Sequence, residues 1–346
     1  MRSVRFATTH DGVSLAWSRS GSGPPLVKAA AWLTHLEYDF ESPVWSHWAS
    51  FLEGSFDFVR YDERGCGLSD RATGQLGLDN WTDDLTRIIA AADPPKPFVL
   101  FAMSQGTGAA VRYAAEHPEH VSHLILIGGY ARGAYCRDDD KGAALYRAVV
   151  EIFRAGFDES NPAFREVFTK RFIPMGDPDK IAWFNDLCRR ATDAELGAQL
   201  IDARGHMDAS GVLSKLRCPT LVLHAREDAV APLSEGRFLA QHIPGATFQI
   251  LDSSNHILQA DEPAWDTASR AILDFVGAQS QPDDYGLTGR EQAILAEIGK
   301  AKSNKEIARV LDVSEKTVRN HATRIFAKMG VATRQEAIVK SRQAKE

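Results

Sequence analysis

Short apolar runs alternate with helical stretches over residues 1 to about 278. Five of these runs are rich in β-branched and aromatic residues and are bounded by turn residues: "FDFVRYD", "FVLFAM", "HLILIGG", "TLVLHA" and "TFQILD". Continuous apolar strands separated by helices are typical of a mainly parallel sheet covered on both faces. The pattern predicts a doubly wound α/β domain at residues 1–278.

A long interruption separates the third and fourth runs. The stretch from about residue 131 to residue 216 contains no strand-like run and has aromatic residues at helical spacing. This pattern predicts a helical cap inserted into the sheet domain. The aromatic positions are Phe153, Phe157, Phe164, Phe168, Trp183 and Phe184. Most are expected to form the core of the cap, and a few to face a cavity.

The C-terminal part has a different pattern. The polar stretch "GAQSQPDDYG" has the composition of a linker, which we place at 279–286, and residues 287–346 form four short helical units. Thr288 with Glu291, and Ser303 with Glu306, have the spacing of capping boxes and predict two helix starts. This pattern predicts a small all-α domain after the sheet domain.

The third unit begins near Ser314 and is amphipathic. Its apolar stripe consists of Val318, Ala322, Ile325, Phe326 and Met329. The opposite face holds Lys316, Arg319, Asn320, Thr323 and Ala327, with Thr317, His321, Arg324 and Lys328 on a flank. Taken alone, this is either a solvated basic face or a surface for DNA, because Arg and Asn suit base edges and flanking cations suit phosphates.

Charge is unevenly divided along the 346 residues. The whole chain has a formal charge of −6, but from Asp283 onward 13 lysines and arginines face 9 acidic residues, a charge of +4 that leaves −10 for the rest. The two parts are therefore expected to have different partners.

Other features of the composition predict a cytoplasmic protein without metal or cofactor. We find no apolar run of membrane-spanning length and no secretory signal at the N-terminus, so no membrane partner is expected. The four cysteines are Cys66, Cys136, Cys188 and Cys218. Their wide spacing contains no C-x-x-C pair, which favours reduced thiols over zinc or redox chemistry.

Ser104 is the candidate nucleophile. It follows the run "FVLFAM" and precedes a helical stretch, with Ala102 two residues before it and Gly106 two residues after it. A nucleophile on a strained strand-to-helix turn requires such small neighbours, because the turn brings their backbones together. The match is weak alone, and its context supports it.

A serine nucleophile needs a base and an orienting carboxylate. Asp228 follows "TLVLHA", with Glu227 as a competing candidate, and His256 follows "TFQILD". Both lie just after a predicted strand, whereas His35, His206 and His224 lack this placement. The sequence predicts a Ser104, Asp228, His256 triad.

Residues 1–278 resemble the α/β-hydrolase fold family through "YDERGCGLSD", "AMSQG", "LHAREDAVAP" and "NHI". The resemblance implies an oxyanion hole made by the backbone N–H groups of Trp32 and Gln105. The chain departs from the family at Ala30 and Ala31, which stand where the family usually has a His-Gly pair.

The C-terminal segment closely resembles the LuxR-type helix-turn-helix domain, with "LTGRE", "SNKEIARVL", "SEKTVRNH", "IFAKMGV" and "TRQEA" in register. The resemblance implies that Ser314 to Lys328 enters the major groove of double-stranded DNA and that the protein binds as a homodimer. It assigns base contacts to Arg319, Asn320 and Thr323 and phosphate contacts to Lys305, Thr317, His321 and Lys328, with Lys316 on the DNA-facing surface.

Together, these features predict a ligand-responsive transcriptional regulator whose α/β-hydrolase domain senses, and could hydrolyse, a small apolar ester or lactone. The main alternative is an ester or lactone hydrolase whose appended domain only localises it. A DNA-associated scaffold without a ligand is a third interpretation.

Overall fold

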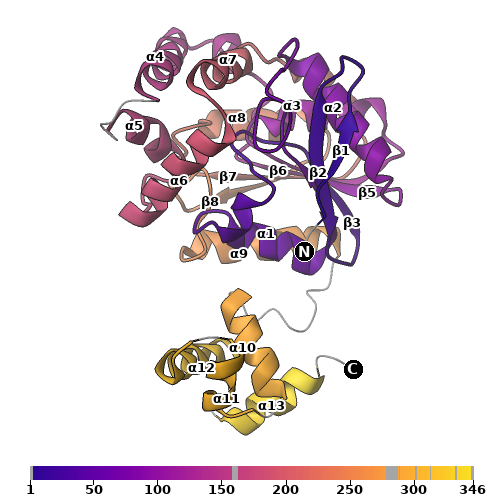
Figure 1. Cartoon of the computed structure of the whole chain (residues 1–346). Coiled ribbons are helices and arrows are strands. Elements are labelled where there is room, and N and C mark those ends of the chain that lie inside the picture. Colours follow the sequence, from indigo (N-terminus) through magenta and orange to yellow (C-terminus); the bar gives the residue numbers. More distant parts are fainter. Residues whose placement is uncertain are drawn as a thin grey trace. The chain divides into compact units, whose positions relative to one another are not determined.

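The computed structural model describes residues 3–157, 163–277, 287, 289–300, 302–311, 313–331 and 333–343. The chain divides into two compact units, Met1–Ala278 and Gln279–Glu346, which are described separately (Figure 1). The predicted linker at 279–286 lies outside the described residues.

An eight-stranded sheet forms the centre of the first unit, with strand order β1-β2-β4-β3-β5-β6-β7-β8. The strands are β1 (Arg5–Thr8), β2 (Ser14–Ser20), β3 (Pro25–Lys28), β4 (Asp57–Tyr61), β5 (Phe98–Met103), β6 (Val121–Ile127), β7 (Thr220–Ala225) and β8 (Thr247–Leu251). β2 pairs antiparallel with β1 and β4, and every other pairing is parallel. The predicted doubly wound, mainly parallel sheet is confirmed.

Helices cover both faces of this sheet. Alternate residues of β5 belong to different cores: Phe101 packs toward one face and Leu100 toward the other. Helices α1 (Ser46–Ser55) and α9 (Pro263–Val276) pack on the face of Phe101. The opposite face is covered by α2 (Leu78–Ala92), α3 (Gly106–Glu116) and α8 (Leu233–His242). Every residue of β5 is buried, which explains its unbroken apolar run.

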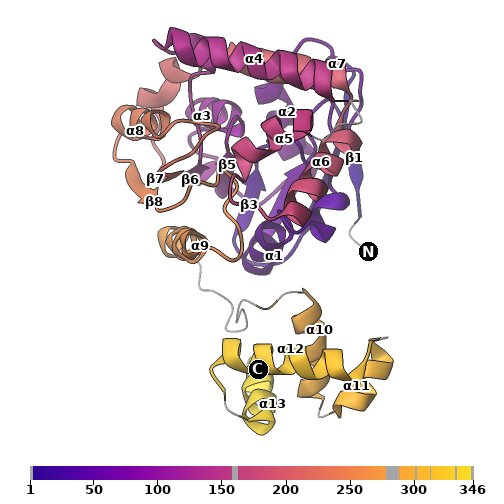
Figure 2. The same ribbon diagram turned by 90° about the vertical axis from the view of Figure 1, so that its left-hand side faces the viewer.

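Between β6 and β7 the chain forms a helical cap. It consists of α4 (Asp140–Gly156), α5 (Ala163–Phe172), α6 (Pro178–Ala191) and α7 (Ala194–Gly205), which lie together beyond one end of the sheet (Figures 1 and 2). Three of these helices begin at an aspartate whose side chain accepts a backbone N–H: Asp139, Asp177 and Asp193. Among the described helices, none is long and apolar enough to cross a membrane.

The described residues of the second unit form four helices: α10 (Gly289–Gly299), α11 (Asn304–Val310), α12 (Glu315–Met329) and α13 (Arg334–Gln343). Ser303 and Glu306 form the capping box expected at the start of α11, and Ser314 caps α12. The predicted capping partner of Glu291, Thr288, lies outside the described residues. The apolar stripe of α12 contributes Val318 and Ile325 to the small core of this unit.

Candidate functional site

Ser104 occupies a strained turn between β5 and α3. Its φ of 50° lies in the left-handed region, which costs a non-glycine residue about 1 to 3 kcal/mol. The Ser104 backbone N–H donates to the Ile127 carbonyl at 3.0 Å, which holds the turn against the end of β6. Strain of this kind is a feature of the nucleophile turn in α/β-hydrolases.

Two glycines allow close contacts around this turn: Gly106 with the backbone after β3, and Gly128 with the His256 side chain. A Cβ on Gly106 would lie 2.6 Å from the Ala30 carbonyl oxygen, closer than real Cβ contacts come. A Cβ on Gly128, which has a φ of +54°, would lie 3.0 Å from His256 Cε1. The small residue expected two positions after Ser104 is therefore required by the loop that follows β3.

His256 and Asp228 form a buried hydrogen-bonded pair. His256 Nδ1 lies 2.6 Å from Asp228 Oδ2, and Asp228 Oδ1 accepts the Val230 and Ala231 N–H groups at 2.8 and 2.9 Å. Burial raises the pKa of Asp228, but the charge and hydrogen bond of His256 outweigh that effect and leave the pKa lowered. An ionised carboxylate can thus orient the imidazole.

The structure places the competing candidates differently. Glu227 is exposed and Asp228 is buried, so only Asp228 faces His256. His224, which sequence reasoning set aside, is fully buried with Nε2 3.8 Å from Asp228, but it is within hydrogen-bond distance of the Ala231 carbonyl at 2.9 Å. Burial also lowers the pKa of His224. The contact of His224 with the Ala231 carbonyl therefore helps to hold the loop that carries Asp228.

Ser104 and His256 both contact the segment that ends β6. Ser104 bonds to Ile127, and Gly128 abuts the His256 ring. Within the described part of the chain, Ser104 Oγ makes no hydrogen bond. Catalytic hydrogen bonds are often loose without substrate and tighten in the complex.

The oxyanion donors predicted from the resemblance lie beside this turn. Gln105 directly precedes α3, and neither the Gln105 nor the Trp32 backbone N–H bonds to another described residue. Leu33 follows Trp32 with a φ of 59°, so a buried leucine takes the left-handed conformation in a loop that lacks the family's glycine. Asp62 steadies the loop by accepting the Leu36 N–H at 3.1 Å.

A pocket containing Ser104 lies beneath the cap, with about 460 Å³ of space free of protein atoms, part of which is open to solvent. We call it the Ser104 pocket. It is lined by Trp32, Ser104, Gln105, Tyr130, Ala134, Arg137, Tyr146, Phe168, Arg171, Phe172, Ile201, Arg204 and Val230. The wall is therefore apolar and aromatic with three arginines, which sequence periodicity did not reveal.

The cap aromatics divide between this pocket and the cap core. Phe168 lines the pocket, whereas Phe157 and Phe184 are buried within the core and Phe164 is 46% exposed. Phe172, which the sequence analysis did not single out, also lines the pocket, and its carbonyl accepts the His256 N–H at 2.9 Å. The cap therefore helps to hold the candidate base.

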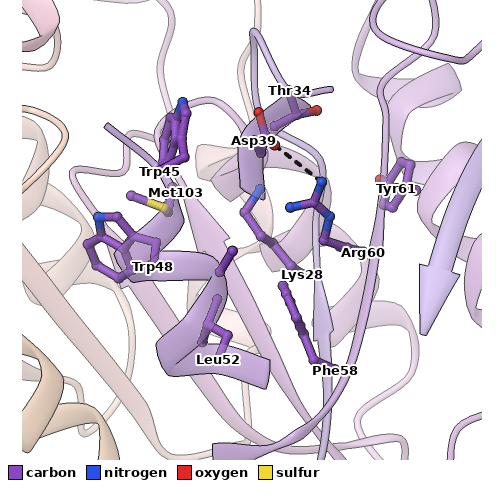
Figure 3. Close-up of a pocket in the computed structure, with 11 residues that line it drawn as sticks. Lys28, Thr34, Asp39, Trp45, Trp48, Leu52, Phe58, Arg60, Tyr61 and Met103 are labelled. Atoms are coloured by element: carbon purple, nitrogen blue, oxygen red, sulfur yellow. Dashed lines mark ion pairs between the residues drawn. The ribbon is translucent and has the colours of Figure 1, made fainter. Parts of the chain in front are cut away.

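A second cavity, of about 420 Å³, contains buried charges and no candidate nucleophile (Figure 3). Lys28 points into it, and Arg60 Nη2 lies 3.3 Å from Asp39 Oδ2. Burial lowers the pKa of Lys28 and raises that of Asp39. The opposite charges lie together, as buried charges generally must.

The predicted DNA-facing side of α12 is exposed. Arg319, Asn320, Thr323 and Lys316 all lie on the surface, as does Lys305 on α11. The Arg319 guanidinium approaches Glu315 only to 3.9 Å. The side chains proposed to contact bases are therefore accessible.

Of the residues predicted to contact phosphate, two have side-chain partners within the second unit and a third is partly buried there. Lys328 Nζ lies 2.8 Å from Glu291 Oε2, and the side chain of Glu291 is only 3% exposed. Thr317 Oγ1 lies 2.7 Å from the Ser314 hydroxyl, and Nδ1 of the partly buried His321 has no hydrogen-bond partner among the described residues. Lys328 therefore has a structural role, and its phosphate contact stays a prediction.

Comparison with known proteins identifies both units. A family model described as alpha/beta hydrolase fold matches residues 35–263, and one described as bacterial regulatory proteins, luxR family, matches residues 286–341. The chain belongs to the α/β-hydrolase fold family and carries a luxR-family domain at its C-terminal end.

The curated and solved relatives match the first unit. The chain is 24% identical over 278 residues to non-heme chloroperoxidase CPO-A1 of Kitasatospora aureofaciens, covering 78% of this chain and 98% of the relative. It is 23% identical to 3-oxoadipate enol-lactonase 2 of Acinetobacter baylyi, covering 66% and 83%. An esterase structure from Exiguobacterium antarcticum superposes with a TM-score of 0.67 at 23% identity, covering 79% and 99%.

Proposed function

We propose that the protein is a ligand-responsive transcriptional regulator. Its α/β-hydrolase domain binds a small ester or lactone in the Ser104 pocket, and α12 reads DNA. The observation that carries the proposal is the presence, in one chain, of a strained Ser104 turn under a cap and a helix with exposed Arg319 and Asn320. A free-standing esterase has no need of a DNA reader.

The geometry also supports turnover of the ligand. Ser104 Oγ would attack the acyl carbon while His256 Nε2 takes its proton, and the Asp228 carboxylate would stabilise the imidazolium. The Trp32 and Gln105 N–H groups would hold the oxyanion. His256 then protonates the departing alcohol, and water cleaves the acyl-enzyme to release an acid.

Several observations favour an ester or lactone as the ligand. The pocket wall is largely apolar and aromatic, and such walls bind compact apolar molecules. One of the relatives is named as an enol-lactonase, and a structural relative is named as an esterase. Hydrolysis would then serve to read or to clear the signal.

The regulator proposal is tested first on DNA. Selection of bound sequences from a random duplex library with the full-length protein should yield a two-half-site operator, because we expect a homodimer. Light scattering of the complex measures the number of copies. Failure to enrich any sequence would reject the regulator.

The ligand is tested by native mass spectrometry of the protein purified from its host. We expect a co-purified or covalently attached small molecule, and fluorescence anisotropy should then show a shift in operator affinity when that molecule is added back. An equal affinity with and without it would reject ligand control, since a ligand with no preference between states shifts no equilibrium.

The second candidate function is an ester or lactone hydrolase with an accessory DNA-binding domain. The buried His256–Asp228 pair favours it, because a pure receptor has no chemical need of an oriented base. Rapid hydrolysis of p-nitrophenyl butyrate together with no operator binding would establish this function and reject the first.

A further inference from the structure

The three arginines of the Ser104 pocket differ in how they are neutralised. Arg204 is 3% exposed and pairs with Glu63, and Arg137 Nε lies 3.7 Å from Glu235 Oε1. Arg171 differs from both. Within the described residues it has no carboxylate within ion-pair distance, and its Nη2 donates only to the Ala229 carbonyl at 3.2 Å.

Asp228 is the carboxylate that acts electrostatically on Arg171, but it already has hydrogen-bond partners. Asp228 accepts from His256 through Oδ2 and from two backbone N–H groups through Oδ1. Burial lowers the pKa of Arg171, and Tyr146 and Asp228 offset this only in part. Arg171 is only partly buried and lines the pocket, so its guanidinium, which has no carboxylate partner among the described residues, can be reached by an anion that enters.

Other lining residues carry donors that also lack partners. Arg204 Nε and Nη1, Gln105 Nε2 and Trp32 Nε1 are buried, and none has a hydrogen-bond partner among the described residues. All four are nitrogen donors. Each of these donors belongs to a residue that lines the pocket, and each has an unmet preference for an acceptor.

We infer that the ligand of the Ser104 pocket is an acidic ester or lactone: its acyl carbonyl lies at Ser104 and a carboxylate on the same molecule pairs with Arg171. This inference rests on the proposed function and narrows its substrate class. The planar guanidinium suits a carboxylate because it can donate two parallel hydrogen bonds. Phe168, Phe172 and Ile201 would contact the carbon chain between the two groups.

The test compares half-esters with neutral diesters of the same length. Full-length protein carrying Ser104→Ala, which cannot turn the probe over, is titrated calorimetrically with the monomethyl and dimethyl esters of succinate, glutarate, adipate and suberate. We expect at least one half-ester to bind about tenfold to a hundredfold more tightly than its diester, since a charge-assisted pair forms only with the acid.

Arg171→Gln in the same background should remove this preference, so that each half-ester and its diester bind equally tightly. Arg189→Gln is the matched control, because Arg189 is an exposed arginine on α6 of the same cap and does not line the pocket. Arg171→Lys, which keeps the charge and loses the fork, should retain an intermediate preference and also serves if Arg171→Gln does not fold.

Equal binding of each half-ester and its diester, tighter binding of the diesters, or binding of neither would overturn the inference. So would a preference for half-esters that survives Arg171→Gln. The titration uses no DNA and no turnover, so its result is separate from the operator and hydrolysis experiments. Absence of operator binding rejects the regulator and leaves the half-ester preference standing.

Discussion

Arg64 and Arg204 of the hydrolase domain are buried, whereas Arg319 and Arg324 of α12 are exposed. Arg64 donates to Asp84 and Asp11, and Arg204 to Glu63, so that these charges are largely neutralised inside the domain. The α12 arginines face solvent instead. Cations inside a domain can contact only a small molecule that enters it, while exposed cations can meet a long polyanion such as DNA.

The largest effect on one domain alone is expected from Ser104→Ala. Hydrolysis of p-nitrophenyl butyrate should fall at least about a thousandfold, because the nucleophile is lost, while operator affinity stays unchanged without ligand. The matched control is Ser234→Ala, an exposed serine on α8, which should leave hydrolysis intact. Hydrolysis that persists in the Ser104 variant would place the chemistry elsewhere.

Arg319→Ala tests the other half of the comparison. Operator affinity should fall about tenfold to a hundredfold and base preference should relax, because Arg319 is proposed to contact bases. Ester hydrolysis should not change. Fluorescence anisotropy measures operator affinity and base preference. The comparison variant is Lys305→Ala, which should weaken binding to all duplexes alike and reduce the salt dependence of binding. Identical behaviour of the two variants would contradict the proposed docking.

The buried charges should make the stability of the hydrolase domain depend on pH. Burial raises the pKa of Asp39 to about 7 from its ordinary 3.8, so the folded state binds more protons than the unfolded state between these values. The free energy of unfolding should therefore fall by about 1 to 3 kcal/mol as pH rises from about 4 to 7. Asp39→Asn should flatten this slope.

Urea unfolding followed by tryptophan fluorescence measures this slope in the intact chain. All seven tryptophans lie before residue 279, so the signal reports on the hydrolase domain alone. Asp252→Asn, which removes an exposed carboxylate, is the control and should keep the slope. A slope equal in the Asp39 variant and the wild type would assign the pH dependence to other groups.

Lys328 differs from the exposed arginines of α12, because its charge contacts a buried acid. Lys328→Met should destabilise that unit by about 1 kcal/mol, since Glu291 loses a charged partner. Faster hydrogen exchange in α10 and α12 should report this. Arg324→Met, exposed on the same helix, should leave exchange unchanged; equal exchange in both variants would mean that the ion pair adds no stability.

The sequence could predict the features that depend on local pattern. The strand ends that carry Ser104, Asp228 and His256 follow from apolar runs and turn residues, and the caps at Ser303 and Ser314 follow from their spacing. Strands β1, β2 and β3 are not among the five predicted runs; β1 and β3 have only four residues each.

Features that depend on distant contacts could not be predicted. Lys28, Asp39 and Arg60 come from three separate segments and line one cavity only in the folded domain. Arg204 and Glu63, which form an ion pair, are 141 residues apart. Leu33 was unexpected for another reason. Glycine usually signals a left-handed turn, and here surrounding packing imposes that conformation on a leucine.

The close approach of Gly106 to the Ala30 carbonyl has a consequence for the loop that bears Trp32. One added methyl group at position 106 would push the loop bearing Trp32 away from Ser104 and leave the cap and the rest of the pocket wall in place. Under the proposed function, that one methyl group would weaken hydrolysis of the ligand and leave its binding pocket in place.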